Sequence, residues 1–147
     1  MESDVKSQPG SRLQLAIDVA DLHEAIDFYT RLFATPPAKV REGYANFEIV
    51  DPPLKLVLLE SPATAGSLNH LGIEVADPAA VAAATQRLGG EGLGLRADDG
   101  VCCFADQAKV WVDAPDDVRW EVYAVVADSP TFFADPQGGP TTDCCAS

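Results

Sequence analysis

The chain has 147 residues, 47% of them hydrophobic, which is enough for one ordinary core in a single domain. Its net charge of −13 repels polyanions, so nucleic acid and anionic membrane surfaces are excluded as main partners. No apolar run approaches the roughly 18 residues that a membrane span needs, and the polar start lacks the apolar stretch of a secretory signal. We therefore expect a cytoplasmic protein.

The first 60 residues predict a strand, a helix and three further strands. After a flexible polar segment (1–10), residues 12–19 alternate apolar and other side chains, which is typical of a strand. Asp21 is positioned as a helix N-cap, with Glu24 three residues on, and apolar side chains then fall on one face up to Phe33. Turn signals separate the strands expected near 38–41, 44–50 and 54–60.

This order of elements occurs twice. Residues 14–21, QLAIDVAD, align with residues 70–77, HLGIEVAD, at an offset of 56. The second copy predicts a strand at 68–75, a helix at 78–88 ended by Gly89-Gly90, and strands near 93–98, 108–113 and 119–126. The sequence thus predicts an α+β fold in which two βαβββ modules, about 11–61 and 67–127, form one domain over 11–127. A flexible tail that contains cysteines follows at 128–147.

Strand parity brings three polar side chains to one face of the predicted sheets. Gln14 and His70 occupy equivalent repeat positions, opposite the apolar side chains of their strands, and Glu121 lies within the apolar strand RWEVYAV. A carboxylate there is costly to bury without a cation or hydrogen-bond donors. The three together predict an open site for Fe(II), Mn(II), Ni(II) or Zn(II), similar to the facial triad of non-haem iron oxygenases. The first module aligns approximately Leu56 with Glu121 and supplies no fourth ligand.

Two vicinal cysteine pairs stand out, Cys102-Cys103 and Cys144-Cys145. A disulfide between neighbours is strained, and a reducing compartment disfavours structural disulfides. Two interpretations remain open: that all four cysteines are simply free thiols, or that a vicinal pair has a function. The other histidine, His23, lies in the first turn of a helix, where we expect it to face solvent.

These residues resemble the vicinal oxygen chelate superfamily, which includes glyoxalases and bleomycin-resistance proteins, over residues 12 to about 127. Within it the chain looks most like the group of cadmium-induced proteins and organoarsenical carbon–arsenic lyases. The matching stretches are 25–29 (AIDFY), 43–47 (GYANF), 53–58 (PLKLVL), 68–72 (LNHLG), Cys102-Cys103, 109–112 (KVWV) and 120–123 (WEVY). Phe104 departs from the tyrosine expected there, which could alter the fit around the organic group.

The resemblance implies a dioxygenase-type enzyme that uses Fe(II) and O2 to convert trivalent organoarsenicals, such as methylarsenite or aromatic arsenicals, to arsenite. It implies that Gln14, His70 and Glu121 are the metal ligands, with Ni, Co, Mn or Zn as other occupants, and that Cys102 and Cys103 are the catalytic, substrate-binding thiols. Trivalent arsenic is thiophilic, and a monosubstituted arsenical has two exchangeable positions that adjacent thiolates can take. The implied partners are these small molecules, with the protein a monomer or homodimer.

Other readings stay open. The thiols and the acidic surface also suit a non-catalytic binder of cadmium or arsenite, and the superfamily includes glyoxalase-like metalloenzymes. Lys109, just past the Cys102-Cys103 loop, is expected to be a solvated surface residue, the alternative being an ion pair with an acidic group when the loop closes. Cys144-Cys145 could capture soft metal or be irrelevant to turnover.

Overall fold

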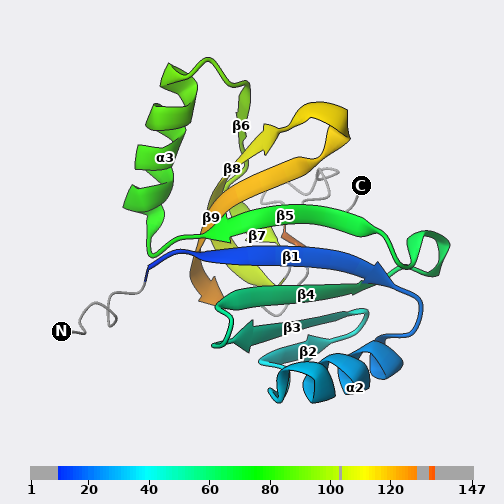
Figure 1. The fold of residues 1–147 in the computed structure, drawn as a ribbon. Coiled ribbons are helices and arrows are strands. Elements are labelled where there is room, and N and C mark those ends of the chain that lie inside the picture. The colour runs from blue at the N-terminus through cyan, green and yellow to red at the C-terminus, as the bar shows by residue number, and fades with distance from the viewer. Residues whose placement is uncertain (1–9, 103, 129–132, 135–147) are drawn as a thin grey trace. The chain divides into compact units, whose positions relative to one another are not determined.

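The structure, a computed structural model, describes residues 10–102, 104–128 and 133–134 (Figure 1). It divides into two compact units. The first unit is Leu13–Leu71, and the second unit is Gly72–Ser147 together with Met1–Arg12. Residues 1–9 of the predicted flexible N-terminal segment fall outside the described residues, as do Cys103, Cys144 and Cys145. Most of the predicted tail (128–147) is likewise outside them, but Asp128 belongs to a strand and residues 133–134 form another. The boundaries of the predicted modules and domain remain a prediction.

The first unit contains the elements that the alternating and helical patterns predict. They are β1 (Arg12–Val19), α2 (Leu22–Phe33), β2 (Lys39–Arg41), β3 (Tyr44–Ile49), β4 (Leu54–Glu60) and the first part of β5 (Leu68–Glu74). The short 3-10 helix η1 (Pro62–Thr64), between β4 and β5, was not predicted. β1 pairs in parallel with β4, and β3 pairs antiparallel with both β4 and β2. The parallel pairing is possible because α2 and two strands lie between β1 and β4 in the chain, as in any crossover connection.

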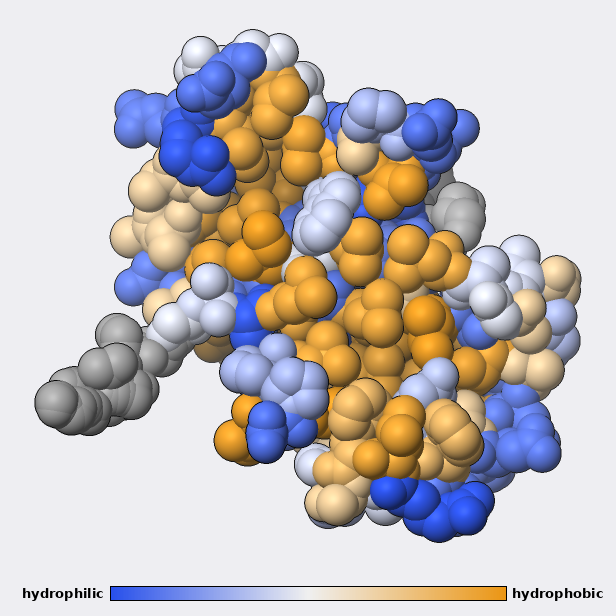
Figure 2. All heavy atoms as spheres, in the orientation of Figure 1, coloured by the Kyte–Doolittle hydropathy of each residue, from blue (hydrophilic) through white to orange (hydrophobic). Residues whose placement is uncertain are grey.

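Capping and burial explain where α2 begins and what it covers. The side chain of Asp21 accepts a hydrogen bond from the backbone N–H of Glu24 (3.0 Å), which confirms Asp21 as the N-cap. The helix packs on the sheet face that carries Phe47, Leu56 and Leu58, each no more than 1% exposed. Apolar side chains also gather at the surface over α2, where Phe28 and Leu32 are more than half exposed (Figure 2).

The second unit has more strands after its helix than the repeat predicts. Its elements are α3 (Pro78–Gly90), β6 (Leu95–Ala97), β7 (Gly100–Cys102), β8 (Ala105–Asp113), the 3-10 helix η2 (Pro115–Asp117), β9 (Arg119–Asp128) and β10 (Phe133–Ala134). β8 pairs antiparallel with β9, β6 and β7, and β10 pairs with β7. Val81 of α3 packs with Val110, Val122 and Ala124 of the strands. The expected α+β class is therefore confirmed, because each unit consists of strands with one helix packed against them.

The main departure from prediction is the hairpin of β7 and β8. Residues 100–102 were expected to belong to a loop, but they pair with 105–107, so the second strand begins at Ala105 rather than near residue 108. Only two residues connect the strands, and Phe104 there has φ +63°, which is uncommon for a bulky side chain. Among the described residues, no helix is long and apolar enough to cross a membrane.

Candidate metal and thiol site

The sheet of the first unit has one polar face. On β1, Gln14, Ala16 and Asp18 lie opposite the apolar side chains that pack under α2. The polar side chains on this face are nevertheless buried, with exposed fractions of 6% or less: Gln14, Asp18, Asn46, Lys55 and His70. Alternation along each strand thus gives the unit an apolar core on one side and a buried polar surface on the other.

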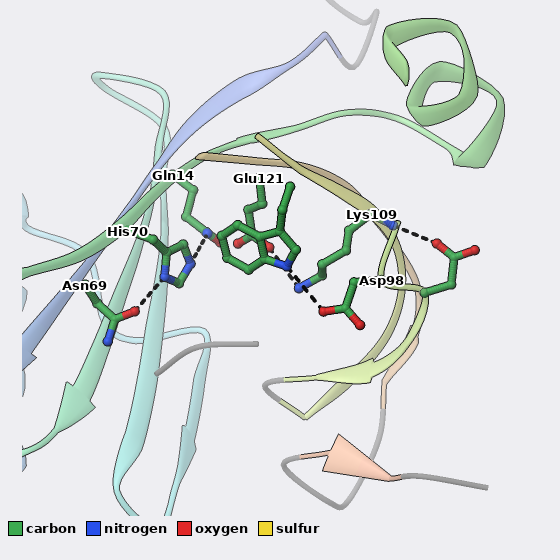
Figure 3. A network of polar contacts seen from close by, with 8 residues as sticks. Gln14, Asn69, His70, Asp98, Lys109 and Glu121 are labelled. Carbon is green, nitrogen blue, oxygen red and sulfur yellow. Dashed lines mark hydrogen bonds and ion pairs between the residues drawn. The ribbon is translucent and has the colours of Figure 1, made fainter. Parts of the chain in front are cut away.

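Gln14 and His70 meet on this polar face. The Nε2 atoms of Gln14 and His70 are 3.2 Å apart, and His70 is 2% exposed (Figure 3). Two neighbouring ligands of a first-row metal, each about 2.1 Å from the ion, are roughly 3.0–3.5 Å apart. The spacing of the pair therefore suits two positions of one coordination sphere, once the Gln14 amide turns its oxygen toward the ion. The prediction that these two repeat-equivalent side chains converge is correct.

The other ring nitrogen of His70 is also engaged. His70 Nδ1 lies 2.8 Å from Asn69 Oδ1 (Figure 3). Asn69 Nδ2 in turn donates to Asp18 Oδ1 at 3.1 Å. Histidines that bind metals generally use their second ring nitrogen in such an outer hydrogen bond. Both contacts of the His70 ring, at Nδ1 with Asn69 and at Nε2 with Gln14, therefore suit a metal-binding histidine.

Glu121 belongs to the second unit, where it forms a buried ion pair. Lys109 Nζ lies 2.8 Å from Glu121 Oε1, and the two side chains are 2% and 4% exposed (Figure 3). They are diagonal neighbours, because Lys109 pairs with Tyr123 and Trp111 with Glu121 across β8 and β9. The expectation that Lys109 is a solvated surface residue is wrong, since alternation along β8 places it opposite Val110 and beside the carboxylate.

Sequence reasoning missed the cation-rich surroundings of Trp111. Its ring lies 4.8 Å from Arg119 Cζ and 5.5 Å from Lys109 Nζ, both within the range of cation–π attraction. Its indole Nε1 donates to Asp98 at 3.2 Å. The signal was present in KVWV, whose two valines alternate with Lys109 and Trp111, so the pair had to share the face opposite the core.

The expected alignment of Leu56 with Glu121 is wrong, because the two side chains lie on opposite kinds of strand face, one apolar and one polar. Leu56 is 1% exposed within the apolar core of the first unit, whereas Glu121 lies opposite the core residues Val122 and Ala124. The β4 side chains on the polar face are those of Lys55, Val57 and Leu59, and none of them offers a carboxylate or an imidazole. The conclusion that β4 supplies no fourth metal ligand still holds, but the reason is the side chains on its polar face and not Leu56.

The thiol pair is described only in part. The backbone of Cys102 ends β7 and pairs with Ala105, while Cys103 lies outside the described residues. Phe104, the predicted departure from the family pattern, is 9% exposed. In the part of the chain that is described, no three His, Cys, Asp or Glu side chains gather as a metal site. Gln14 is not of those types, and each unit is described by itself, so the set of Gln14, His70 and Glu121 remains a prediction.

The arrangement of helix and strands matches a known architecture. Homoprotocatechuate 2,3-dioxygenase from Arthrobacter globiformis superposes with a TM-score of 0.60 at 18% identity, covering 84% of this chain and 38% of that one. At that identity the likeness establishes the fold alone. The pattern of the Glyoxalase/Bleomycin resistance protein/Dioxygenase superfamily matches residues 12–139. The chain belongs to this superfamily, and its fold is that of the vicinal oxygen chelate proteins.

Two relatives are much more similar in sequence. A cadmium-induced protein, CadI, from Mycobacterium tuberculosis is 55% identical over 141 residues, which cover 92% of this chain and 93% of the relative. A trivalent organoarsenical cleaving enzyme from Thermomonospora curvata is 53% identical over 124 residues, covering 83% and 82%. Both relatives support the group to which the sequence motifs pointed.

Proposed function

We propose that this protein cleaves the carbon–arsenic bond of trivalent organoarsenicals, with Fe(II) and O2, and releases arsenite. The observation that carries the proposal is the 53% identity, over most of both chains, to a protein named for cleaving trivalent organoarsenicals. The convergence of Gln14 and His70 at 3.2 Å supports it independently, because this pair suits metal binding.

The proposed ligands are Gln14, His70 and Glu121. An amide oxygen, an imidazole nitrogen and a carboxylate oxygen form a donor set that suits Fe(II), and Ni, Co, Mn or Zn are possible occupants. When bound, iron would supply an electron-rich centre with open positions at which O2 is activated. The ion pair with Lys109 engages Glu121 Oε1, and a carboxylate has about four acceptor positions, so that ion pair is compatible with a metal at the second oxygen.

The proposed substrate ligands are the thiolates of Cys102 and Cys103. Each displaces one exchangeable group on the arsenic, so the organic substituent stays attached while the arsenic is held. This exchange needs no redox step, because thiolate replaces hydroxide on a centre that remains trivalent. The two sets of residues therefore have different proposed roles. The thiols bind and orient the arsenical, while the amide, imidazole and carboxylate hold the metal.

The test is aerobic and anaerobic incubation of methylarsenite with the Fe(II)-loaded protein, with arsenite release followed by chromatography and elemental mass spectrometry. We expect release only with O2, and loss of release in His70→Ala and Cys102→Ala. His23→Ala is the matched control, because His23 is exposed on α2 in the same unit as His70. Normal release by a folded His70→Ala protein would exclude the proposed metal site.

A non-catalytic binder of cadmium or arsenite is the second candidate. The 55% identity to a cadmium-induced protein favours it. Such a protein takes up metal stoichiometrically and leaves methylarsenite unchanged. Many turnovers per protein under aerobic conditions would reject binding as the whole function, and uptake without any turnover would reject the lyase.

A further inference from the structure

We propose that Asp18 and Asn69 are positioning residues that fix the tautomer of His70, so that the lone pair of its Nε2 atom points toward Gln14 and the metal position. All four side chains belong to the first unit and are connected by hydrogen bonds in the order Asp18, Asn69, His70, Gln14. Figure 3 shows the last three of them, from Asn69 to Gln14.

The chain of hydrogen bonds starts at a group that can only accept. The carboxylate of Asp18 is 3% exposed and accepts from Thr64 Oγ1 at 2.7 Å and from Asn69 Nδ2 at 3.1 Å. The backbone of Asp18 is also fixed, because its N–H donates to the Ser67 carbonyl and its own carbonyl accepts from Gly66 N. A buried carboxylate that is held by donors has one orientation and leaves its partners no choice of role.

The acceptor role of Asp18 then determines which atom is donor and which is acceptor in each later hydrogen bond of the series. Because Asp18 needs a donor, the NH2 group of Asn69 faces it, and the amide oxygen of Asn69 faces His70. That oxygen accepts only, so the hydrogen in the 2.8 Å contact sits on His70 Nδ1. The neutral ring then carries its lone pair on Nε2, which accepts from the Gln14 amide 3.2 Å away. Metal binding uses this same lone pair.

The hydrogen-bonded series from Asp18 to Gln14 has no counterpart in the second copy of the internal repeat. Glu74 is the repeat counterpart of Asp18, but it pairs with Arg12 at 2.5 Å in the second unit. Leu13 is the counterpart of Asn69 and has no amide to pass on the polarity. Asn69 and its bond to Asp18 therefore occur beside the histidine and not beside Gln14. That is the pattern expected if they serve the imidazole rather than the fold of a module.

The first test reads the tautomer directly in the metal-free protein. The chain has two histidines, so nitrogen-15 labelling of histidine gives two imidazoles for NMR, and His23→Gln assigns them. We expect the Nδ1–H form at His70, and loss of that preference in Asn69→Leu, which keeps the side-chain size but removes the acceptor. Leu22→Ala, a core change on α2, is the control for general loss of stability and should leave the His70 tautomer unchanged.

The second test measures Co(II) affinity by calorimetry, with no turnover involved. Asn69→Leu should weaken binding by about 10–100-fold, as is usual for removal of an outer hydrogen-bond partner of a metal ligand. The exchange Asp18→Asn/Asn69→Asp should recover most of the loss. The amide at position 18 would then donate to a carboxylate at position 69, which again accepts from Nδ1. This exchange also keeps the proposal testable if Asn69→Leu does not fold.

The two readouts separate this inference from the proposed function. The affinity arm rests on the proposed metal site, whereas the tautomer arm does not. An unchanged His70 tautomer in folded Asn69→Leu, or an exchanged pair that has lost the Nδ1–H form, would overturn the inference. A shifted tautomer with unchanged Co(II) affinity would keep the positioning role but remove His70 from the metal site.

Discussion

Replacing Lys109 with methionine should destabilise the metal-free protein strongly. Lys109 and Glu121 are 2% and 4% exposed, and Nζ and Oε1 are 2.8 Å apart, so water screens neither charge. Methionine keeps the unbranched apolar chain of lysine and removes the ammonium group, which leaves a buried carboxylate without this counter-ion. The loss of one partner of a buried pair costs about 3–5 kcal/mol.

That cost is large enough to measure by thermal unfolding. At about 2–4 °C per kcal/mol for a chain near this size, the midpoint should fall by roughly 6–20 °C. Lys109→Met/Glu121→Leu, which removes both charges, should recover most of the loss, because apolar replacement of a whole buried pair is often close to neutral. The double-mutant cycle then isolates the coupling between the two side chains.

Urea unfolding of the metal-free protein, followed by circular dichroism, gives the free energies for the four proteins of this cycle. A loss below about 1 kcal/mol in Lys109→Met would match an exposed pair and would refute the reasoning from burial. Saturating Co(II), at about 100 times its dissociation constant, adds about 2.7 kcal/mol to a protein that binds it only when folded. If Glu121 is a ligand, the double variant should lose most of that gain.

Three further outcomes follow from the first unit. Gln14→Ala should weaken Co(II) binding by about tenfold or more, and an unchanged dissociation constant in calorimetry would remove Gln14 from the proposed ligands. Leu56→Ala should lower the free energy of unfolding by about 2–5 kcal/mol, because Leu56 is 1% exposed in the core, whereas a negligible loss would contradict the face assigned to it. Asp21→Ala should cost about 1 kcal/mol through loss of the helix cap, and equal urea midpoints for the two proteins would show that the bond to Glu24 does not stabilise α2.

The local patterns of the first unit were sufficient to predict its strands and its α-helix. β1 and β4 have the predicted bounds because their apolar residues are bounded by turn residues on both sides, and α2 begins where its cap predicts. β7 was missed because Gly100, Val101 and Cys102 are too few to show a period, and the strand exists only through its pairing with β8. Three-residue strands of this kind depend on tertiary context more than on composition.

The errors about the site have a common physical origin. A shift of one residue reverses the face of a strand, so an approximate alignment of Leu56 with Glu121 was enough to place a core side chain on the polar face. Lys109 was judged by its residue type, although Val110 and the alternation of β8 already indicated its direction. Gln14 and His70 were predicted to converge because the repeat fixed their parity without any need for an exact register across strands.

The parallel pairing of β1 with β4 also has a consequence during synthesis. Leu13 pairs with Leu54 and Val19 with Glu60, so β1 has no partner in β4 until residues 54–60 have left the ribosome. At about 5–20 residues per second, the chain spends seconds with Leu15, Ile17 and Val19 uncovered, although α2 can already form. A nascent strand in that state is open to pairing with other chains. The correct folding in the cell of the strand that carries Gln14 therefore depends on the steady release of later sequence.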